Sequence, residues 1–112
     1  MTTVINKKTL EQYCQIFGRE RMKSLWSDFQ TTTEEKLSNI NEADKEQIRL
    51  CFHSLRSSSL VFGMEKFALC CEKIENLLVE ESELYDLQKS IDKSKELYYN
   101  ARGVVINFFE EI

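Results

Sequence analysis

Residues 42–63 read EADKEQIRLCFHSLRSSSLVFG, and their apolar and small side chains recur at helical spacing up to a glycine, which predicts a long helix. The residues that share one face of a helix over 42–62 are Ile48, Cys51, Phe52, Leu55, Ser58, Ser59 and Phe62. Gly63 is a natural helix end, since glycine readily takes the left-handed conformation that follows a helix. At the other end we expect Asn41 to be the N-cap, with Glu42 and Asp44 in the first turn.

The rest of the chain shows the same helical spacing, with breaks at Gly18, residues 39–41, Gly63 and residues 80–82. The predicted helices are 9–17, 19–40, 42–62, 64–79 and 83–110. In the second of these, Thr32 and Thr33 interrupt an apolar stripe that includes Leu25. Short connections make neighbouring helices antiparallel. The sequence therefore predicts a single all-α domain over residues 1–112, an antiparallel up-down-up-down four-helix bundle with a short extra N-terminal helix.

Composition excludes several classes of protein. The chain has 112 residues, no proline and three glycines, which argues against a turn-rich β fold. No segment has the apolar length of a membrane span, and the N-terminus lacks the apolar run of a signal peptide, so we expect a cytoplasmic protein with no membrane partner. The net charge of -4 is opposite to that of most nucleic-acid binders, so nucleic acid is not an expected partner.

The four cysteines are Cys14, Cys51, Cys70 and Cys71, and we expect reduced thiols that pack as small hydrophobes. A disulfide framework is typical of secreted chains with little core. A metal or redox site that uses Cys51, Cys70, Cys71 and His53 is disfavoured by geometry. On a helix, Cys51 and His53 point about 200° apart, and Cys70 and Cys71 about 100° apart. We therefore expect no metal site.

His53 is the only histidine, and helical spacing turns it about 160° away from Leu55, the centre of the apolar face. It is therefore expected to face solvent. Imidazole is a nucleophile near neutral pH, and the guanidinium of Arg56, one turn further on, can hold the oxygens of a phosphoryl group. His53 lies ten residues before Gly63 and Glu75 twelve after it. In an antiparallel hairpin their heights above the turn are similar, about 15 Å and 18 Å, so Glu75 can accept the distal N–H of the ring.

Four more residues fall on the His53 side of the helix: Arg49, Leu50, Ser57 and Leu60. The core does not require the two leucines there, so we expect them to form the apolar part of a partner-docking surface. The small Ser57 allows a partner's backbone to approach. Leu60 can alternatively pack against a neighbouring helix. An exposed histidine beside an arginine is most often ordinary solvated surface, so spacing alone leaves a functional role open.

The segment His53-Ser54-Leu55-Arg56-Ser57-Ser58-Ser59-Leu60-Val61-Phe62-Gly63 resembles the signature of the histidine phosphotransfer (HPt) domain family. In that signature a histidine is followed by an aliphatic residue at +2, lysine or arginine at +3, glycine or another small residue at +4, small residues at +5 and +6, and glycine at +10. The next residues that resemble the family are Phe67, Cys70, Cys71, Ile74 and Glu75. This chain has Arg56 where lysine is commoner, Ser57 where glycine is commoner, and Glu75 where glutamine is frequent.

The resemblance implies that His53 is phosphorylated through its outward ring nitrogen. It accepts the phosphoryl group from an aspartyl phosphate on a receiver domain and passes it to another response-regulator receiver. The small Ser58 and Ser59 are then expected to let the third and fourth helices approach closely. The implied partners are hybrid sensor kinases and receiver domains, and the implied protein is a monomer.

The sequence has no glycine-rich nucleotide-binding stretch, so we expect a phosphocarrier without ATP-dependent kinase activity of its own. No cofactor is expected on this chain, because the Mg²⁺ used in transfer belongs to the partner receiver. The alternative function is a non-catalytic helical adaptor that binds signalling proteins without being phosphorylated. That alternative predicts that His53 can be replaced without loss of activity.

Overall fold

The structure is a computed structural model that describes residues 4–81 and 83–111. Within these residues the chain forms five α-helices, one short 3-10 helix and no strand. The α-helices are α1 (Lys7–Phe17), α2 (Arg19–Ser38), α3 (Lys45–Leu60), α4 (Glu65–Val79) and α5 (Leu84–Glu110), with the 3-10 helix Ile40–Glu42 between α2 and α3. The prediction of an all-α fold is confirmed. Ser82, part of the predicted break before the last helix, lies outside the described residues.

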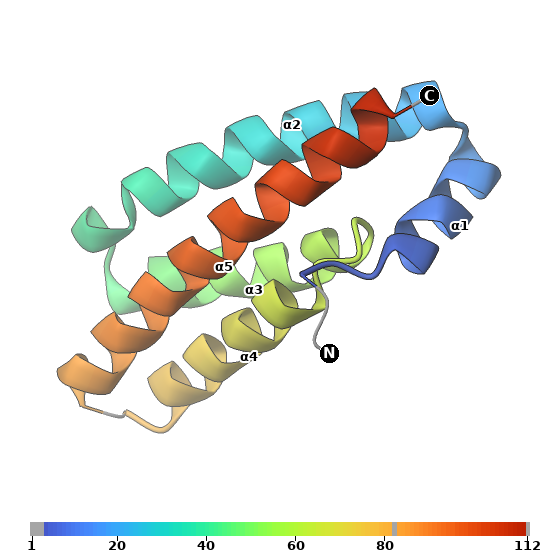
Figure 1. The fold of residues 1–112 in the computed structure, drawn as a ribbon. Coiled ribbons are helices and arrows are strands. Elements are labelled where there is room, and N and C mark those ends of the chain that lie inside the picture. The colour runs from blue at the N-terminus through green and yellow to red at the C-terminus, as the bar shows by residue number, and fades with distance from the viewer. Residues whose placement is uncertain (1–3, 82, 112) are drawn as a thin grey trace.

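The four longer helices lie alongside one another, and α1 lies beyond one end of them (Figure 1). The most extensive helix pairings join α3 to α4 and α4 to α5, while α2 contacts α5, α3 and α1. Their buried side chains form one core, which includes Met22, Leu37, Phe52, Phe67, Ile74, Tyr98 and Val105. No helix in the described part of the chain combines the length and apolar character needed to cross a membrane.

The start of α3 differs from the sequence prediction. Asp44 is the N-cap, and its side chain accepts a hydrogen bond from the backbone N–H of Gln47 at 2.8 Å. The Gln47 side chain in turn accepts from the backbone N–H of Asp44 at 3.0 Å. This capping box satisfies two otherwise unpaired donors at once. The prediction that Asn41 is the N-cap was wrong, because Asn41 lies inside the 3-10 helix and α3 begins later, at Lys45.

The buried face of α2 also differs from the prediction at two positions. Thr33 is fully buried and continues the apolar stripe, whereas Leu25 is exposed. The buried residues of α2 are Met22, Trp26, Phe29, Thr33 and Leu37. Their spacing of four, three, four and four residues keeps them on one side of the helix, and Leu25 falls one position outside that series. Thr33 therefore belongs to the core rather than interrupting it.

The turn between α3 and α4 depends on Gly63. Its backbone has a φ of +73°, a conformation that costs strain for residues with a side chain. Its carbonyl accepts the backbone N–H of Asn6 at 2.7 Å, and a Cβ at this position would overlap the Asn6 carbonyl oxygen. Asn6 also caps α1, since its side chain accepts from the backbone N–H of Thr9. The same turn thus reverses the chain and anchors the segment that leads into α1.

We predict that Gly63→Ala lowers the free energy of unfolding by about 2 kcal/mol or more, because it adds left-handed strain and a clash with Asn6. Gly103→Ala is the matched control. Gly103 lies within α5 with nothing near the added methyl group, so alanine there should stabilise the protein by about 0.5–1 kcal/mol. Urea denaturation of both variants tests this. Equal stability of the Gly63→Ala variant and the original chain would contradict the account of the turn.

Candidate functional site

His53 lies in the second half of α3, and its side chain is 59% exposed. Its Nδ1 atom is 3.1 Å from Oε1 and 3.4 Å from Oε2 of Glu75. Glu75 belongs to α4, and only 15% of its side chain is exposed. The α3–α4 hairpin therefore brings together the two residues that the sequence places at similar heights on either side of Gly63.

The contact with Glu75 determines which ring nitrogen is available. A carboxylate can only accept hydrogen bonds, so Nδ1 of a neutral His53 ring carries the proton and donates it to Glu75. The lone pair is then on Nε2, the other ring nitrogen. Glu75 thus fixes both the tautomer and the orientation of the ring, as carboxylates do for reactive or metal-bound histidines. The result is a nucleophilic nitrogen on an exposed, oriented ring.

Two arginines lie on α3 within about one turn of His53. Measured around the helix from His53, Arg49 lies about 40° and Arg56 about 60° to the same side, the side of α4. In the described part of the chain no ion pair holds Arg56, while Arg49 forms an ion pair with Glu46 at 2.7 Å. The hydrogen bond and charge of Glu46, and to a smaller extent the charge of Glu75, raise the pKa of Arg49.

The expected docking residues are also near His53. Leu50, Ser57 and Leu60 are all exposed, so Leu60 is not buried against another helix. Ser57 and Leu60, together with Arg56, line a hollow of about 550 Å³ between α3 and α4. Leu50 instead lines a second hollow that faces the end of α2 and the 3-10 helix. The two leucines therefore lie beside different hollows, and whether they bind a partner stays a prediction.

The two serines expected to let α3 and α4 approach have different surroundings. Ser59 is fully buried, and its hydroxyl donates to the backbone carbonyl of Arg56 at 3.0 Å. Ser58 is only half-buried and lines a hollow between α2 and α3. The position of Ser58 therefore does not support a role at the contact with α4. Gly63 acts at the turn, as described above.

The cysteines lie apart from the exposed face of His53. Cys70 and Cys71 are buried, and Cys14 and Cys51 are half-buried free thiols. Burial is the main cause that raises the pKa of each of the four thiols. A raised pKa keeps a thiol protonated and poorly nucleophilic. These residues therefore contribute to packing rather than to the chemistry at His53.

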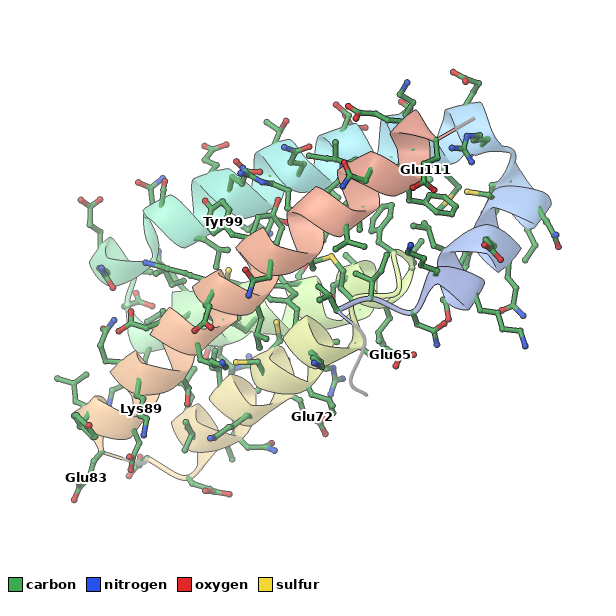
Figure 2. All side chains as sticks on the ribbon, in the orientation of Figure 1. Glu65, Glu72, Glu83, Lys89, Tyr99 and Glu111 are labelled. Carbon is green, nitrogen blue, oxygen red and sulfur yellow. The ribbon has the colours of Figure 1, made fainter. Side chains whose placement is uncertain are left out.

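Sequence reasoning missed four residues around the site. Glu46 is the partner of Arg49, and its position three residues earlier on the same helix is a signal that the sequence contains. The other three are Glu65, Leu69 and Glu72 of α4, which line the hollow beside Ser57. Figure 2 shows Glu65 near the start of α4 and Glu72 further along it. These three residues lie beside α3 because of the way that α3 and α4 pack, and no local sequence pattern predicts that packing.

Comparison with protein families agrees with this geometry. The family model of the Hpt domain matches residues 24–103, from α2 through most of α5, and so includes His53, Arg56, Gly63 and Glu75. No curated protein and no solved structure matches the chain. The family match covers well over half of the 112 residues. The chain therefore belongs to the Hpt domain family, whose members take part in histidine phosphotransfer within phosphorelays.

Proposed function

We propose that this chain is a phosphorelay intermediate. His53 accepts a phosphoryl group from the aspartyl phosphate of a receiver domain and passes it to another response-regulator receiver. The observation that carries this proposal is the exposed His53 ring whose Nδ1 is held by Glu75 at 3.1 Å, which leaves Nε2 free to react. The proposed scaffold is an antiparallel up-down-up-down bundle of α2–α5, supported by the short connections between successive helices.

The proposed transfer step uses this arrangement. The Nε2 lone pair attacks phosphorus, the P–O bond to the aspartyl oxygen breaks, and aspartate leaves as a carboxylate with the electron pair of that bond. Nδ1 keeps its proton, so the phosphorylated ring is an imidazolium whose positive charge faces Glu75. Because Glu75 is mostly buried, its charge is poorly screened and stabilises the developing cation. Transfer onward to a second receiver reverses these steps.

Arg56 is proposed to stabilise the charge on the transferring phosphoryl oxygens. It lies one turn from His53 on the same side as Glu75, and a guanidinium binds phosphoryl oxygens through charge-assisted hydrogen bonds. The chain itself is proposed to be a phosphocarrier with no ATP-dependent kinase activity, and the Mg²⁺ used in transfer is proposed to belong to the receiver. A monomer in the cytoplasm is the form that we propose for the carrier.

The proposed docking surface surrounds His53 and consists of Arg49, Leu50, Ser57 and Leu60. A receiver has to bring an aspartate within bonding distance of Nε2, so the surface nearest the ring is covered in the complex. The exposed leucines supply apolar area, and Ser57 leaves room for the partner's backbone. Hybrid sensor kinases and response-regulator receivers are the proposed partners.

We predict that His53→Gln abolishes phosphoryl acceptance and leaves the helical circular-dichroism signal unchanged, because the side chain is exposed. Labelling with radioactive ATP through a sensor kinase that phosphorylates the original chain tests this. The label on the original chain should be lost in acid and retained in alkali, as expected for a phosphoramidate. Retained labelling of the His53→Gln variant would contradict the proposal. Unchanged signalling by this variant would favour the non-catalytic adaptor.

Arg56→Ala should slow phosphotransfer by about tenfold or more, since a hydrogen bond to a charged group contributes about 1.5–3 kcal/mol. Stability should change by no more than about 0.5 kcal/mol, as is usual for a surface charge. Lys89→Ala, at an exposed cation on α5 (Figure 2), is the matched control and should transfer normally. Rapid-quench transfer assays and thermal melts measure both effects. Normal transfer with a large loss of stability would make Arg56 a structural residue instead.

Leu60→Asp should weaken binding to the receiver that accepts phosphate from this chain by more than about 1 kcal/mol, if Leu60 is a central apolar anchor. Ser57→Glu should weaken binding and block transfer, because a larger charged group obstructs the approach to His53. Leu84→Asp is the control, because it makes the same substitution at another exposed leucine, on α5 instead of α3. Leu84 is 74% exposed and Leu60 is 44% exposed. Titration calorimetry measures the affinity of the three variants for the receiver. Unchanged affinity in Leu60→Asp and Ser57→Glu would show that the docking surface lies elsewhere.

A further inference from the structure

Arg49 occupies a position that the proposed transfer step does not use. It lies one helical turn before His53, about 6 Å along the axis, and on the same side of α3 as Arg56. Helical side chains lean toward the N-terminus of their helix, so the His53 ring leans over the turn that carries Arg49. Glu75 lies near enough for its charge to contribute to the raised pKa of Arg49. A group bound to Nε2 would thus enter a space bordered by two arginines.

Among the residues that the structure describes, Glu46 is the one partner that holds Arg49. The two side chains make a bidentate contact, with Nη2 2.7 Å from Oε1 and Nε 3.0 Å from Oε2. Both are accessible, with 36% of the Arg49 side chain and 64% of the Glu46 side chain exposed. An ion pair this exposed contributes little to stability and separates easily. Glu46 can also lose its partner without being left buried, because water solvates its carboxylate.

We propose that Arg49 is a second phosphoryl-binding residue, which leaves Glu46 and contacts the phosphoryl group once His53 carries it. The inference rests on the proposed function of His53. A phosphoryl group carries a charge of about -1.5 to -2 near neutral pH, against -1 for a carboxylate, and offers three acceptor oxygens. A guanidinium binds such a group bidentately, as it binds Glu46 here. Phosphorylation therefore offers Arg49 a stronger partner at similar distance.

The remaining cation of α3 serves as a matched control. Lys45 is exposed and lies two turns before His53, about 12 Å along the axis. At an ionic strength of about 0.1 M the screening length is about 10 Å, so its charge acts only weakly at the phosphoryl group. Lys45→Gln removes the same formal charge as Arg49→Gln from the same helix. A difference between the two variants therefore reports proximity rather than net charge.

The experiment uses phosphoramidate as a small-molecule phosphoryl donor, so no partner protein is needed. Nε2 of His53 attacks phosphorus, the P–N bond of the N-protonated form of phosphoramidate breaks, and ammonia leaves with the electron pair of that bond. The ³¹P resonance of the phosphorylated chain is then followed as the pH crosses the second phosphoryl ionisation, near about pH 6. A cation in contact favours the dianion and so lowers the midpoint of this titration.

Arg49→Gln should raise the midpoint of the phosphoryl titration by about 0.2–0.7 pH unit, the range expected from the loss of an exposed ion pair. Lys45→Gln should change this midpoint less. Glu46→Gln should lower the midpoint, because Arg49 no longer has a competing partner. When Glu46→Gln is added to Arg49→Gln it should no longer change the midpoint, because the effect of Glu46 acts through Arg49. Circular dichroism checks that every variant stays folded.

Three results would overturn the inference. One is an unchanged midpoint in Arg49→Gln, another is an equal shift in Lys45→Gln, and the third is a Glu46→Gln effect that persists without Arg49. Each of these leaves the role of His53 intact, because the phosphohistidine has formed. Failure to form phosphohistidine at His53 would instead contradict the proposed function, and the inference would fall with it.

Discussion

The tight turn at Gly63 is the constraint on which the site depends. α3 ends at Leu60 and α4 begins at Glu65, so only a few residues set the register between the two helices. That register places His53 beside Glu75. A slip of one residue in either helix rotates a side chain by about 100°, which would separate the ring from its carboxylate. Because Gly63 also binds the backbone of Asn6, the turn is held from outside the hairpin as well as within it.

The charges around His53 suit a carrier better than a tight binding site. Arg49 and Glu46 are accessible to water, whereas Glu75 is mostly buried behind the ring. Exposed cations bind a phosphoryl group weakly because water screens them. A carrier has to release what it accepts, and a group bound too tightly in the intermediate slows the next transfer. In the contact that orients the ring, Glu75 is the less exposed partner, and the proposed transfer uses this contact in both directions.

Much of the site was predictable because its determinants are local. The spacing around His53 predicted an exposed ring, and similar distances from Gly63 predicted the neighbour Glu75. The sequence predictions were wrong where two local signals competed, or where tertiary packing determined the structure. Asn41 and Asp44 are both good N-caps, and the reciprocal bonds with Gln47 select Asp44. The contact between Asn6 and Gly63 joins residues far apart in sequence, so no local pattern contains it.

Part-buried polar contacts also lie away from the α3–α4 hairpin that carries His53, between the other two long helices. Glu34 of α2 accepts hydrogen bonds from Tyr98 at 3.0 Å and Arg102 at 3.2 Å, which joins α2 to α5. Burial first, and then the hydrogen bond to Glu34, raise the pKa of Tyr98, so its hydroxyl remains a donor. Fixed contacts between α2 and α5 stabilise the scaffold. The exposed ion pair between Arg49 and Glu46 is not one of these contacts, so the exchange of partners proposed for Arg49 would cost the fold little.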